Sequence, residues 1–411
     1  MAQKRNWVAI VTMWFIFGMI SFVTNMAAPF GNIWGMSYDW AGMMGNMMNF
    51  AAYLFMGIPA GNMLIKYGYK KTALIALIVG AIGRGIQLLS GVVSNIYVYL
   101  LGALICGFCV CMLNTVVNPM LNLLGGGGNG GNQLIQVGGV FNSAAAVACY
   151  ILMGALIGDA AKAKMADATP ALMIALTIFV IAFVVICFTK IEEPEQAPVQ
   201  LDMIPKALGY RHFALGALAI FLYMGIEVGV PNFVNLYLID TGIPAATAGL
   251  LVAVYWASMM IGRFVGASIG SKVSARAMIT TVSTATLLLV GFGIFAPTDV
   301  LVPFPGVDWS AMTFITQDVP VGIFAMLLVG LCTSVMWGAI FNMAVEGLGK
   351  YTAIASGIFM TMVFGCAVMM GIQGWMADLF GYLSSFWVVM FCAAYLLFYA
   401  LIGSRVSKRA E

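Results

Sequence analysis

The chain has 411 residues, of which 63% are hydrophobic and only 8% are charged, and its formal net charge is +3. A soluble domain carries about 25% charged residues, so this composition excludes a water-soluble globular protein, whose surface it could not cover. The mean hydropathy of +1.02 instead predicts a chain that lies mostly in lipid. The small net charge gives no indication of nucleic-acid binding.

Apolar runs of about 20 residues follow one another along the whole chain. As helices they are long enough to cross a hydrocarbon core of about 30 Å, and they lack the alternating polarity of barrel strands. In chain order, we predict transmembrane helices at 7–28, 42–62, 72–91, 96–118, 135–157, 171–190, 213–237, 246–268, 277–296, 321–344, 353–374 and 383–403. The predicted fold class is therefore an all-α membrane protein with twelve transmembrane helices.

The basic residues predict how these helices are oriented. Cytoplasmic segments of membrane proteins are enriched in Lys and Arg, and with the N-terminus inside, only Lys162 and Lys164 fall in outer loops. The cytoplasmic segments then hold Lys4, Arg5, Lys66, Lys70, Lys71, Lys190, Lys206, Arg211, Lys272, Arg276, Lys350, Arg405, Lys408 and Arg409. The first apolar run is too long for a signal-peptide core and no cleavage pattern follows it. We expect a multi-pass protein of the bacterial inner membrane with both termini in the cytoplasm.

A charged, proline-rich stretch at 190–212 divides the predicted helices into six and six. We predict an N-terminal six-helix bundle at 1–190, a cytoplasmic linker at 191–212 and a C-terminal six-helix bundle at 213–411. The other long segment outside the helices, at 297–320, is expected to be a loop. Two bundles that rock against each other around a central site are the arrangement that a transporter needs.

A faint internal repeat supports the division into halves. Three residues recur 205 positions later in the chain: Gly57, Gly61 and Lys71 as Gly262, Gly266 and Arg276. Small residues four apart permit close contact between helices, and the basic residue that follows anchors the inner face. Both sets of residues lie at the second helix of their half and the loop that follows it. This equivalent location favours a true repeat over chance.

Two further patterns are given a structural interpretation. The glycine-rich segment at 125–132 lacks the GK[ST] ending of a phosphate-binding loop, so we expect a flexible cytoplasmic loop and no ATP hydrolysis in this chain. All eight cysteines lie in predicted spans, where cysteine usually acts as a small apolar residue. We expect neither a metal site nor another cofactor, although a coupling ion stays possible.

Glu227 is the one carboxylate inside a predicted span. A charge at mid-bilayer costs about 2.5–3.5 kcal/mol on insertion scales, so such a residue normally faces a cavity or a partner. Pro231 can open the helix and free carbonyls, and the spacing predicts that Glu227, Pro231 and Asn235 share one face. We favour a role as solute ligand, proton carrier or cation ligand; the alternative is a protonated, structural glutamate.

Amides and tryptophans complete the candidate site. The amides inside predicted spans that we take as candidates are Asn25, Asn114, Asn118, Gln136, Asn142 and Asn235. Amides both donate and accept hydrogen bonds, so together with one carboxylate they suit a neutral polyhydroxyl solute; the alternative is contact between helices. Trp256 and Trp337, far from the predicted interfaces, can stack on a sugar ring or simply pack.

Two bases, Arg84 and Arg263, lie inside spans, and this small number disfavours a strongly anionic substrate. We expect a structural partner for Arg84. Arg263, near the inner end of its span, can snorkel or bond to helix ends. His212, the only histidine, is given no role in coupling.

The motifs resemble the major facilitator superfamily and, within it, the L-fucose:proton symporter group of sugar porters. The matching pieces are Pro59-Ala60-Gly61, Gly68-Tyr69-Lys70-Lys71, Asn118-Pro119, Phe141-Asn142-Ser143, Tyr223-x-Gly225-x-Glu227, Ile261-Gly262-Arg263, Glu346-Gly347-Leu348-Gly349-Lys350 and Ala355-Ser356-Gly357. The resemblance implies two six-helix bundles, alternating access and a hexose or related monosaccharide as substrate. It also implies a gating or loop role for Gly61, Lys70, Lys71 and Arg263.

The chain departs from that group at two positions that, by the resemblance, serve coupling and sugar binding. Where the fucose porter has carboxylates on spans 1 and 4, this sequence has Asn25 and Asn114, and an amide cannot cycle a proton. Asn142 falls on the group's sugar-binding asparagine. Three hypotheses follow: Glu227 alone carries the proton, sodium is held by amide oxygens and Glu227, or transport is uncoupled. We rank sodium or uncoupled transport above proton coupling.

Other classes of function stay open as alternatives. The cargo of such a carrier could instead be a nucleoside, a peptide, a drug or another small polar or amphipathic solute. A membrane enzyme needs a nucleophile–base pair, a metal cluster or paired carboxylates at depth, and the spans offer one carboxylate and no histidine. A sensor would need a larger soluble domain. We therefore expect no enzyme, and a monomer whose partners are its solute and the lipid bilayer.

Overall fold

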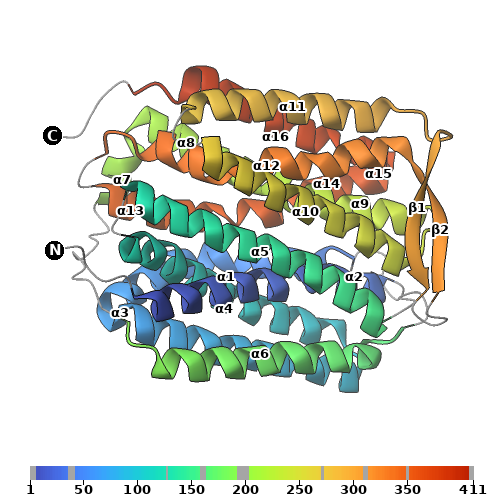
Figure 1. The fold of residues 1–411 in the computed structure, drawn as a ribbon, viewed down its shortest axis with the longest axis horizontal. Helices are drawn as coiled ribbons and strands as arrows, with labels where there is room; N and C mark the ends of the chain where they lie inside the picture. The colour runs from blue at the N-terminus through green and yellow to red at the C-terminus, as the bar shows by residue number, and fades with distance from the viewer. Residues whose placement is uncertain are drawn as a thin grey trace.

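Long apolar helices form most of the structure (Figure 1). The computed structural model describes residues 6–35, 42–125, 128–157, 163–191, 203–269, 273–308, 313–348 and 351–406. The first half contains α1 (Trp7–Asn25), α2 (Ala27–Gly35), α3 (Met44–Val93), α4 (Ile96–Leu124), α5 (Gly128–Ile157), a 3-10 turn (Met165–Ala168) and α6 (Thr169–Phe188). The second half contains α7 (Met203–Leu208), α8 (Arg211–Glu227), α9 (Gly229–Asp240), α10 (Ala245–Ile269), α11 (Ala275–Phe295), β1 (Leu301–Asp308), β2 (Thr313–Pro320), α12 (Val321–Val345), α13 (Thr352–Met362), α14 (Gly365–Phe380), α15 (Tyr382–Ser385), α16 (Trp387–Phe398) and a π-helical turn (Tyr399–Gly403).

The helix α3 contains two of the predicted spans. It has 50 residues and is interrupted at Gly68, whose φ of 80° and ψ of 174° are essentially restricted to glycine. The first half of α3 runs beside α4 in the same direction, and the second half runs beside it in the opposite direction. The contacts that show this are Gly45 to Tyr99 and Tyr53 to Asn114 for the first half, and Gly83 to Cys106 and Gln87 to Gly102 for the second.

This reversal settles the number of membrane crossings. In the described part of the chain, 11 helical stretches are long and apolar enough to cross a membrane, and α3 is one of them. Because α3 reverses at Gly68, it crosses twice, which gives the twelve predicted crossings. The predicted fold class is confirmed.

Three predicted spans are each built from two helices. The first crossing breaks at Met26 between α1 and α2, the seventh at Val228 between α8 and α9, and the eleventh between α13 and α14. Pro29 and Pro231 follow the first two breaks. Since proline has no N–H, each leaves the carbonyl four residues before it without its helical partner. In the seventh crossing that carbonyl belongs to Glu227.

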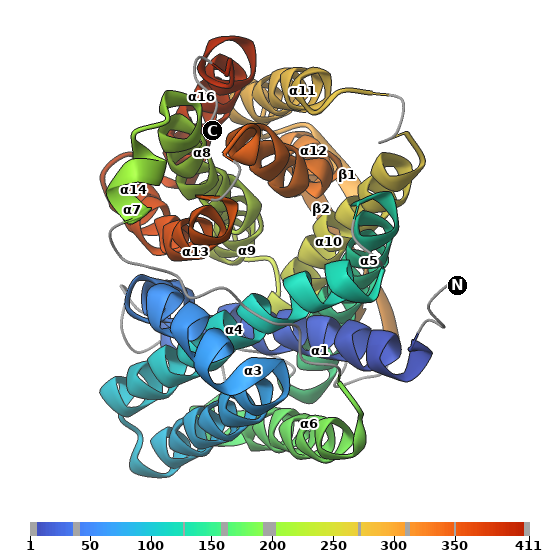
Figure 2. The same cartoon turned by 90° about the vertical axis from the view of Figure 1, so that its left-hand side faces the viewer.

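Seen along the helices, the two halves form two groups (Figure 2). The first group contains α1, α3, α4 and α6, and the second contains α8, α11, α12, α13, α14 and α16. The helices α5 and α10, one from each half, pack against each other where the groups meet. The halves also meet where α3 packs against α13 and α14.

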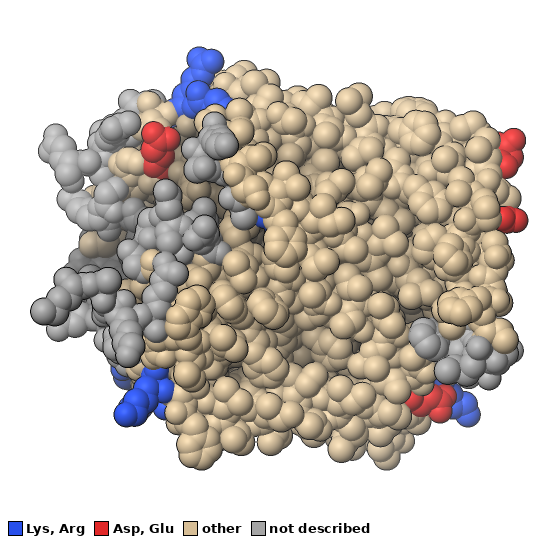
Figure 3. All heavy atoms as spheres, viewed as in Figure 1, with Lys and Arg blue, Asp and Glu red and all other residues tan. Residues whose placement is uncertain are grey.

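The molecule has two distinct ends. We call the end where α1 begins the inner end, following the predicted orientation, and the opposite end the outer end. At the inner end Asn6 Nδ2 donates to the Lys190 carbonyl at 3.1 Å, so α1 begins where α6 ends. On the face seen in Figure 3, the surface between the two ends is almost free of charged residues, as a lipid-facing surface requires.

The segment at 297–320, which we expected to be a loop, contains a β-hairpin. Its strands pair antiparallel from Leu301 with Pro320 to Asp308 with Thr313, and they lie across the outer end (Figure 1). On α10, Thr247 packs against Gly306 of the hairpin. The glycine-rich segment also differs from its predicted loop, because α5 already begins at Gly128; residues 126–127 lie outside the described part.

Candidate functional site

Glu227 and Arg263 form an ion pair in the interior of the molecule. The Arg263 NH2 lies 3.9 Å from Glu227 Oε1, and the two side chains are only 13% and 15% exposed. Glu227 is the last residue of α8, about halfway along the seventh crossing. Since an unpaired charge at this depth is costly, each residue lowers the cost of the other.

Arg263 also joins the two halves of the chain. From α10, its NH1 donates to the Gly139 carbonyl, to Ser143 Oγ at 3.0 Å and to Asn142 Oδ1 at 3.5 Å, all on α5. Asn142 Nδ2 in turn donates to the Phe17 carbonyl of α1 at 3.0 Å. Arg263 therefore points into the boundary between the bundles, where we had expected it to snorkel or to bond to helix ends.

The break in the seventh crossing exposes a carbonyl that another helix satisfies. Pro231 cannot donate to the Glu227 carbonyl, and Tyr255 Oη of α10 donates to it instead at 2.9 Å. The Tyr255 hydroxyl also lies 3.2 Å from Thr333 Oγ1 of α12. Glu227 is thus held by its backbone as well as by its carboxylate, which fixes the carboxylate close to the boundary.

Two other predicted residues lie near this junction on α12 and α5. The ring of Trp337 lies 6.3 Å from that of Tyr223, one helical turn before Glu227. Gln136 faces Gly338, where an added Cβ would lie 3.9 Å from Gln136 Nε2. Trp337 and Gln136 are both partly buried, so each retains access to the space between the halves.

The amides of the first half divide into two kinds. Asn114 Nδ2 donates to Tyr53 Oη at 2.8 Å, which connects α4 to α3. Asn25 and Asn118 bond within their own helices, to the Ser21 carbonyl at 2.9 Å and the Asn114 carbonyl at 3.2 Å. Of these three amides, Asn114 is the one whose hydrogen bond joins two helices.

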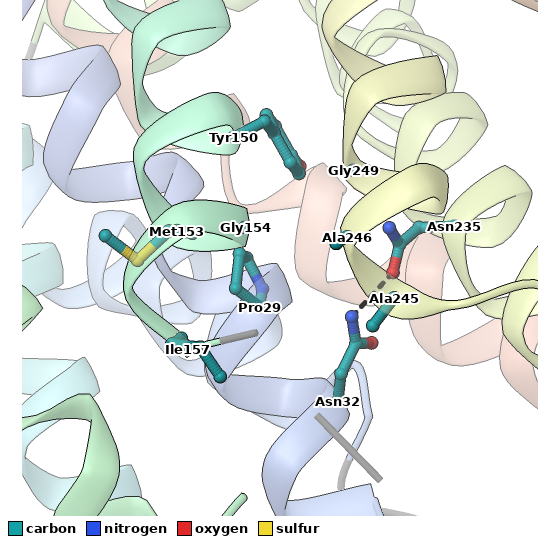
Figure 4. Close-up of a pocket in the computed structure, with 10 residues that line it drawn as sticks. All are labelled: Pro29, Asn32, Tyr150, Met153, Gly154, Ile157, Asn235, Ala245, Ala246 and Gly249. Carbon is teal, nitrogen blue, oxygen red and sulfur yellow. Dashed lines mark hydrogen bonds between the residues drawn. The ribbon is translucent and has the colours of Figure 1, made fainter. Parts of the chain in front are cut away.

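Asn235 lies away from Glu227, at the outer junction of the halves. The two residues lie two helical turns apart in the seventh crossing, on either side of the break at Val228. Asn235 Oδ1 accepts from Asn32 Nδ2 of α2 at 2.9 Å (Figure 4). A second pair lies nearby in the chain, where Asn46 Nδ2 of α3 donates to Asn232 Oδ1 at 2.6 Å.

A small pocket adjoins this outer junction (Figure 4). It is lined by Pro29, Asn32, Tyr150, Met153, Gly154, Ile157, Asn235, Ala245, Ala246 and Gly249. It has room for about one water molecule, far less than a hexose needs. The outer junction is therefore closed here.

Trp256 is buried on α10 and interacts with Tyr150 of α5. Its side chain is 6% exposed, and its indole N–H is the group that faces the Tyr150 hydroxyl. The ring packs edge-on against Tyr255, with the centroids 5.4 Å apart. Trp256 thus has a packing role and contacts both Tyr255 and Tyr150.

The predicted gating residues lie in different surroundings. Lys70 Nζ donates to the carbonyls of Cys187 at 2.8 Å and Thr189 at 2.9 Å, which joins it to the end of α6 in its own half. Lys71 is exposed, and no atom lies within 4 Å of a Cβ placed on Gly61. Gly57 is the residue that contacts the other half, at Thr361 of α13.

Arg84 has the structural partners we expected. It is 1% exposed and donates to Gln87 Oε1 and to the Val23 carbonyl of α1. Sequence reasoning did miss Tyr53, Tyr255, Asn32, Asn46 and Asn232. All five are polar residues within or beside predicted spans, which is the signal that could have found them.

Comparisons with known proteins agree with this architecture. The sequence model of the Major Facilitator Superfamily matches residues 8–364. A glucose/galactose transporter of Brucella abortus is 29% identical, over 97% of this chain and 93% of its own length. A putative glucose/galactose transporter of Helicobacter pylori is 25% identical, over 98% of this chain and 97% of its own. The crystal structure of a variant of the Escherichia coli fucose:proton symporter superposes with a TM-score of 0.73 at 18% identity, covering 98% of this chain and 100% of that one.

Proposed function

The chain belongs to the Major Facilitator Superfamily and is a multi-pass membrane transporter, and we propose that it carries a neutral hexose across the bacterial inner membrane by alternating access. The observation that carries this proposal is the junction of Glu227, Arg263, Asn142 and Ser143 between the two halves. A carrier's solute must pass between its bundles. Family membership also confirms the expectation of a transporter and not an enzyme.

The chemistry of the junction supports a neutral, hydroxylated solute. The carboxylate and the guanidinium balance each other, so the junction does not attract a net charge. Sugar hydroxyls both donate and accept, and the nearby amides, phenols and indoles provide both kinds of partner. Glucose and galactose are the sugars named for the two bacterial relatives, which supports a hexose as cargo.

Arg263 is suited to gate the path from the inner side. Its bonds to the Gly139 carbonyl and to Ser143 hold α10 against α5 on the inner side of the molecule's midpoint. We propose that these bonds are present while this part of the path is closed and break when the inner side opens. Among the described residues, Gly61 and Lys71 of the predicted motif make no comparable contact, so Arg263 is the gating residue we favour.

Coupling is proposed to centre on Glu227. A proton or a sodium ion at the carboxylate would compete with Arg263 for the same oxygens, so cation binding and the contact between α10 and α5 would be linked. Asn25 and Asn114 cannot take up a proton. We keep sodium coupling or uncoupled transport ahead of proton coupling, with both termini cytoplasmic and a monomeric protein.

Counterflow in liposomes tests this function directly. Liposomes that contain the purified protein are loaded with excess unlabelled glucose, galactose or fucose, and entry of the labelled sugar is followed. Because counterflow needs no ion gradient, a symporter and a facilitator both give a signal. We expect transient accumulation of one hexose with competition by the others. If folded protein gave no counterflow of any hexose, the assignment as a transporter would stand, but the proposal that a hexose is the transported solute would be wrong. Imposed sodium and pH gradients then identify the coupling ion.

A further inference from the structure

Glu227 offers two kinds of oxygen at the break in the seventh crossing, its carboxylate and its backbone carbonyl. Since Pro231 has no N–H, the carbonyl lacks its helical partner, and Tyr255 Oη donates to it at 2.9 Å. A carbonyl oxygen has two lone pairs, so this one can take part in a second interaction. Carbonyls freed where transmembrane helices are broken are a recurring source of ligands for Na⁺.

Hydroxyl oxygens from two other helices lie beside this carbonyl. Tyr255 Oη of α10 is 3.2 Å from Thr333 Oγ1 of α12, and both residues are fully buried. The Glu227 carboxylate is close enough to the Tyr255 hydroxyl to interact with it electrostatically. Three helices, α8, α10 and α12, thus bring a carboxylate, a carbonyl and two hydroxyls together in the interior of the second half.

This cluster has more acceptors than protons. Tyr255 and Thr333 bring one proton each, whereas the carboxylate and the carbonyl of Glu227 bring none. Arg263 does not make up the difference, because its NH2 lies 3.9 Å from Glu227 Oε1, beyond the about 2.7–2.9 Å of a charge-assisted hydrogen bond. Buried oxygens with lone pairs to spare are the surroundings that a hard cation requires.

The spacing of the oxygens fits a cation of the size of Na⁺. Ca²⁺, which has nearly the same radius, binds oxygens at about 2.3–2.6 Å, so neighbouring ligands around it lie about 3.3–3.7 Å apart. The distances of 2.9 and 3.2 Å from Tyr255 Oη to the Glu227 carbonyl and to Thr333 Oγ1 need to widen by only about half an ångström to admit such an ion. A single carboxylate balances one positive charge, which favours Na⁺ over a divalent ion.

We propose that Glu227, Tyr255 and Thr333 form a Na⁺ site, in which the carboxylate and the carbonyl of Glu227 and the two hydroxyl oxygens hold the ion. The role of this site in coupling rests on the proposed function. Bound Na⁺ shares the carboxylate with Arg263 and weakens the attraction between the carboxylate and the guanidinium, which also holds α5. Binding of the ion and opening of the inner side are thereby linked through Arg263.

Thermal unfolding of the purified protein in detergent, without sugar, tests the site in equal concentrations of NaCl, KCl and choline chloride. An ion that binds only the folded state raises the melting temperature. We expect NaCl to raise it by about 3 °C over the other two salts. Tyr255→Phe and Thr333→Val should each remove most of this difference, whereas Thr333→Ser, which keeps the hydroxyl, should retain it. Should one variant fail to fold, the others still decide the matter.

Tyr399→Phe and Thr286→Val are the matched controls. Tyr399 is equally buried, and its hydroxyl also donates to a backbone carbonyl of α8, that of His212 at 3.2 Å, but at the inner end. Thr286 is fully buried on α11, and its hydroxyl donates to the Val282 carbonyl of its own helix at 2.8 Å. Both variants should keep the full effect of Na⁺.

Two results would overturn the site: the absence of a Na⁺-specific shift with the unsubstituted protein, or a shift that survives in both Tyr255→Phe and Thr333→Val. Because the measurement contains no sugar, it is independent of the hexose assignment. Hexose counterflow without a Na⁺-specific shift leaves the proposed function and removes the site. A Na⁺-specific shift that these variants abolish, without counterflow of any hexose, supports the site and removes the hexose.

Discussion

Asn46 and Asn232 connect the two halves of the molecule through a hydrogen bond of 2.6 Å between buried side-chain amides. Asn232 Nδ2 donates in turn to the Val228 carbonyl at 2.7 Å, directly at the break between α8 and α9. The amide pair is therefore anchored at the point where the seventh crossing can bend. Together with the bond between Asn32 and Asn235, it makes α9 the element that closes the outer side.

Replacing Asn46 with Leu should favour opening of the outer side. Interhelical hydrogen bonds in membranes contribute about 0.6 kcal/mol on average, which corresponds to an about three-fold change in population. The measurement is the rate at which a membrane-impermeant thiol reagent labels Ile157→Cys, a position that lines the outer pocket. We expect labelling to be about three-fold faster with Asn46→Leu. Thr177→Val, on the exposed face of α6, is the control, and an equal rate in all three proteins would contradict the closing role.

Glu227→Gln should reduce hexose uptake at least about ten-fold. The substitution removes the charge opposite Arg263 and the only carboxylate in a predicted span, so the guanidinium is left unbalanced at depth. Initial uptake rates are measured with and without sodium and proton gradients. Asp240→Asn, at the exposed end of α9, is the control for loss of a carboxylate. Unchanged uptake by well-folded Glu227→Gln protein would remove Glu227 from the mechanism.

A double substitution can distinguish the effect of the ion pair on stability from its effect on transport. Arg263→Gln leaves the Glu227 carboxylate buried without a charged partner, which should destabilise the fold by about 3–5 kcal/mol. Adding Glu227→Gln should restore most of the thermal stability, because the site is then neutral. Transport should stay low, since the bonds from Arg263 to α5 are still absent.

Thermal unfolding in detergent and counterflow of the same samples check both parts. Arg263→Lys is informative as well, because it keeps the charge and loses the planar fork that reaches several acceptors. Full transport by the double variant would show that the pair serves stability alone.

Lys70 and Lys71 should differ in their effect on stability although they are neighbours. Lys70→Met removes two hydrogen bonds to the end of α6 and should cost about 1 kcal/mol of stability. Lys71→Met changes an exposed side chain and should have little effect. Comparison of the two melting temperatures in detergent checks the prediction, and equal temperatures would show that the capping bonds contribute nothing.

Gly57 and Gly61 provide a second matched pair. A Cβ at Gly57 would lie 2.5 Å from Thr361 Oγ1 and 3.1 Å from the Thr361 backbone nitrogen, whereas one at Gly61 would meet nothing within 4 Å. Gly57→Ala should force α3 and α13 apart and slow counterflow several-fold. Gly61→Ala should leave the rate almost unchanged. The opposite order would show that the repeated motif acts through Gly61.

Much of the fold could be predicted from the sequence because lipid imposes a local rule on each span. Runs such as 171–190 and 277–296 can be recognised from the hydropathy of their own residues alone, and α6 and α11 lie close to these predicted ranges. The hairpin at 301–320 could not be found this way, since β1 contains two prolines and neither strand has a long alternating run. The reversal between the second and third spans was predicted, whereas its position at Gly68 is seen only in the structure.

The candidate site was less accessible to sequence reasoning. Glu227 could be chosen because a lone carboxylate in a span is costly wherever it points. Asn25 and Asn46 are both amides in spans, yet Asn25 bonds to its own helix and Asn46 to the opposite half. Which of these occurs depends on how each helix is rotated in its bundle, and that rotation is set by packing across the whole molecule.

The reversal at Gly68 also has a mechanical consequence. A connection of one residue cannot stretch, so the inner ends of the second and third crossings keep a fixed separation whichever side of the carrier is open. Lys70, two residues further on, ties the same corner to the end of α6. The inner ends of three of the six crossings of this half are thereby held together. We expect these three crossings to move as one rigid unit when the half tilts.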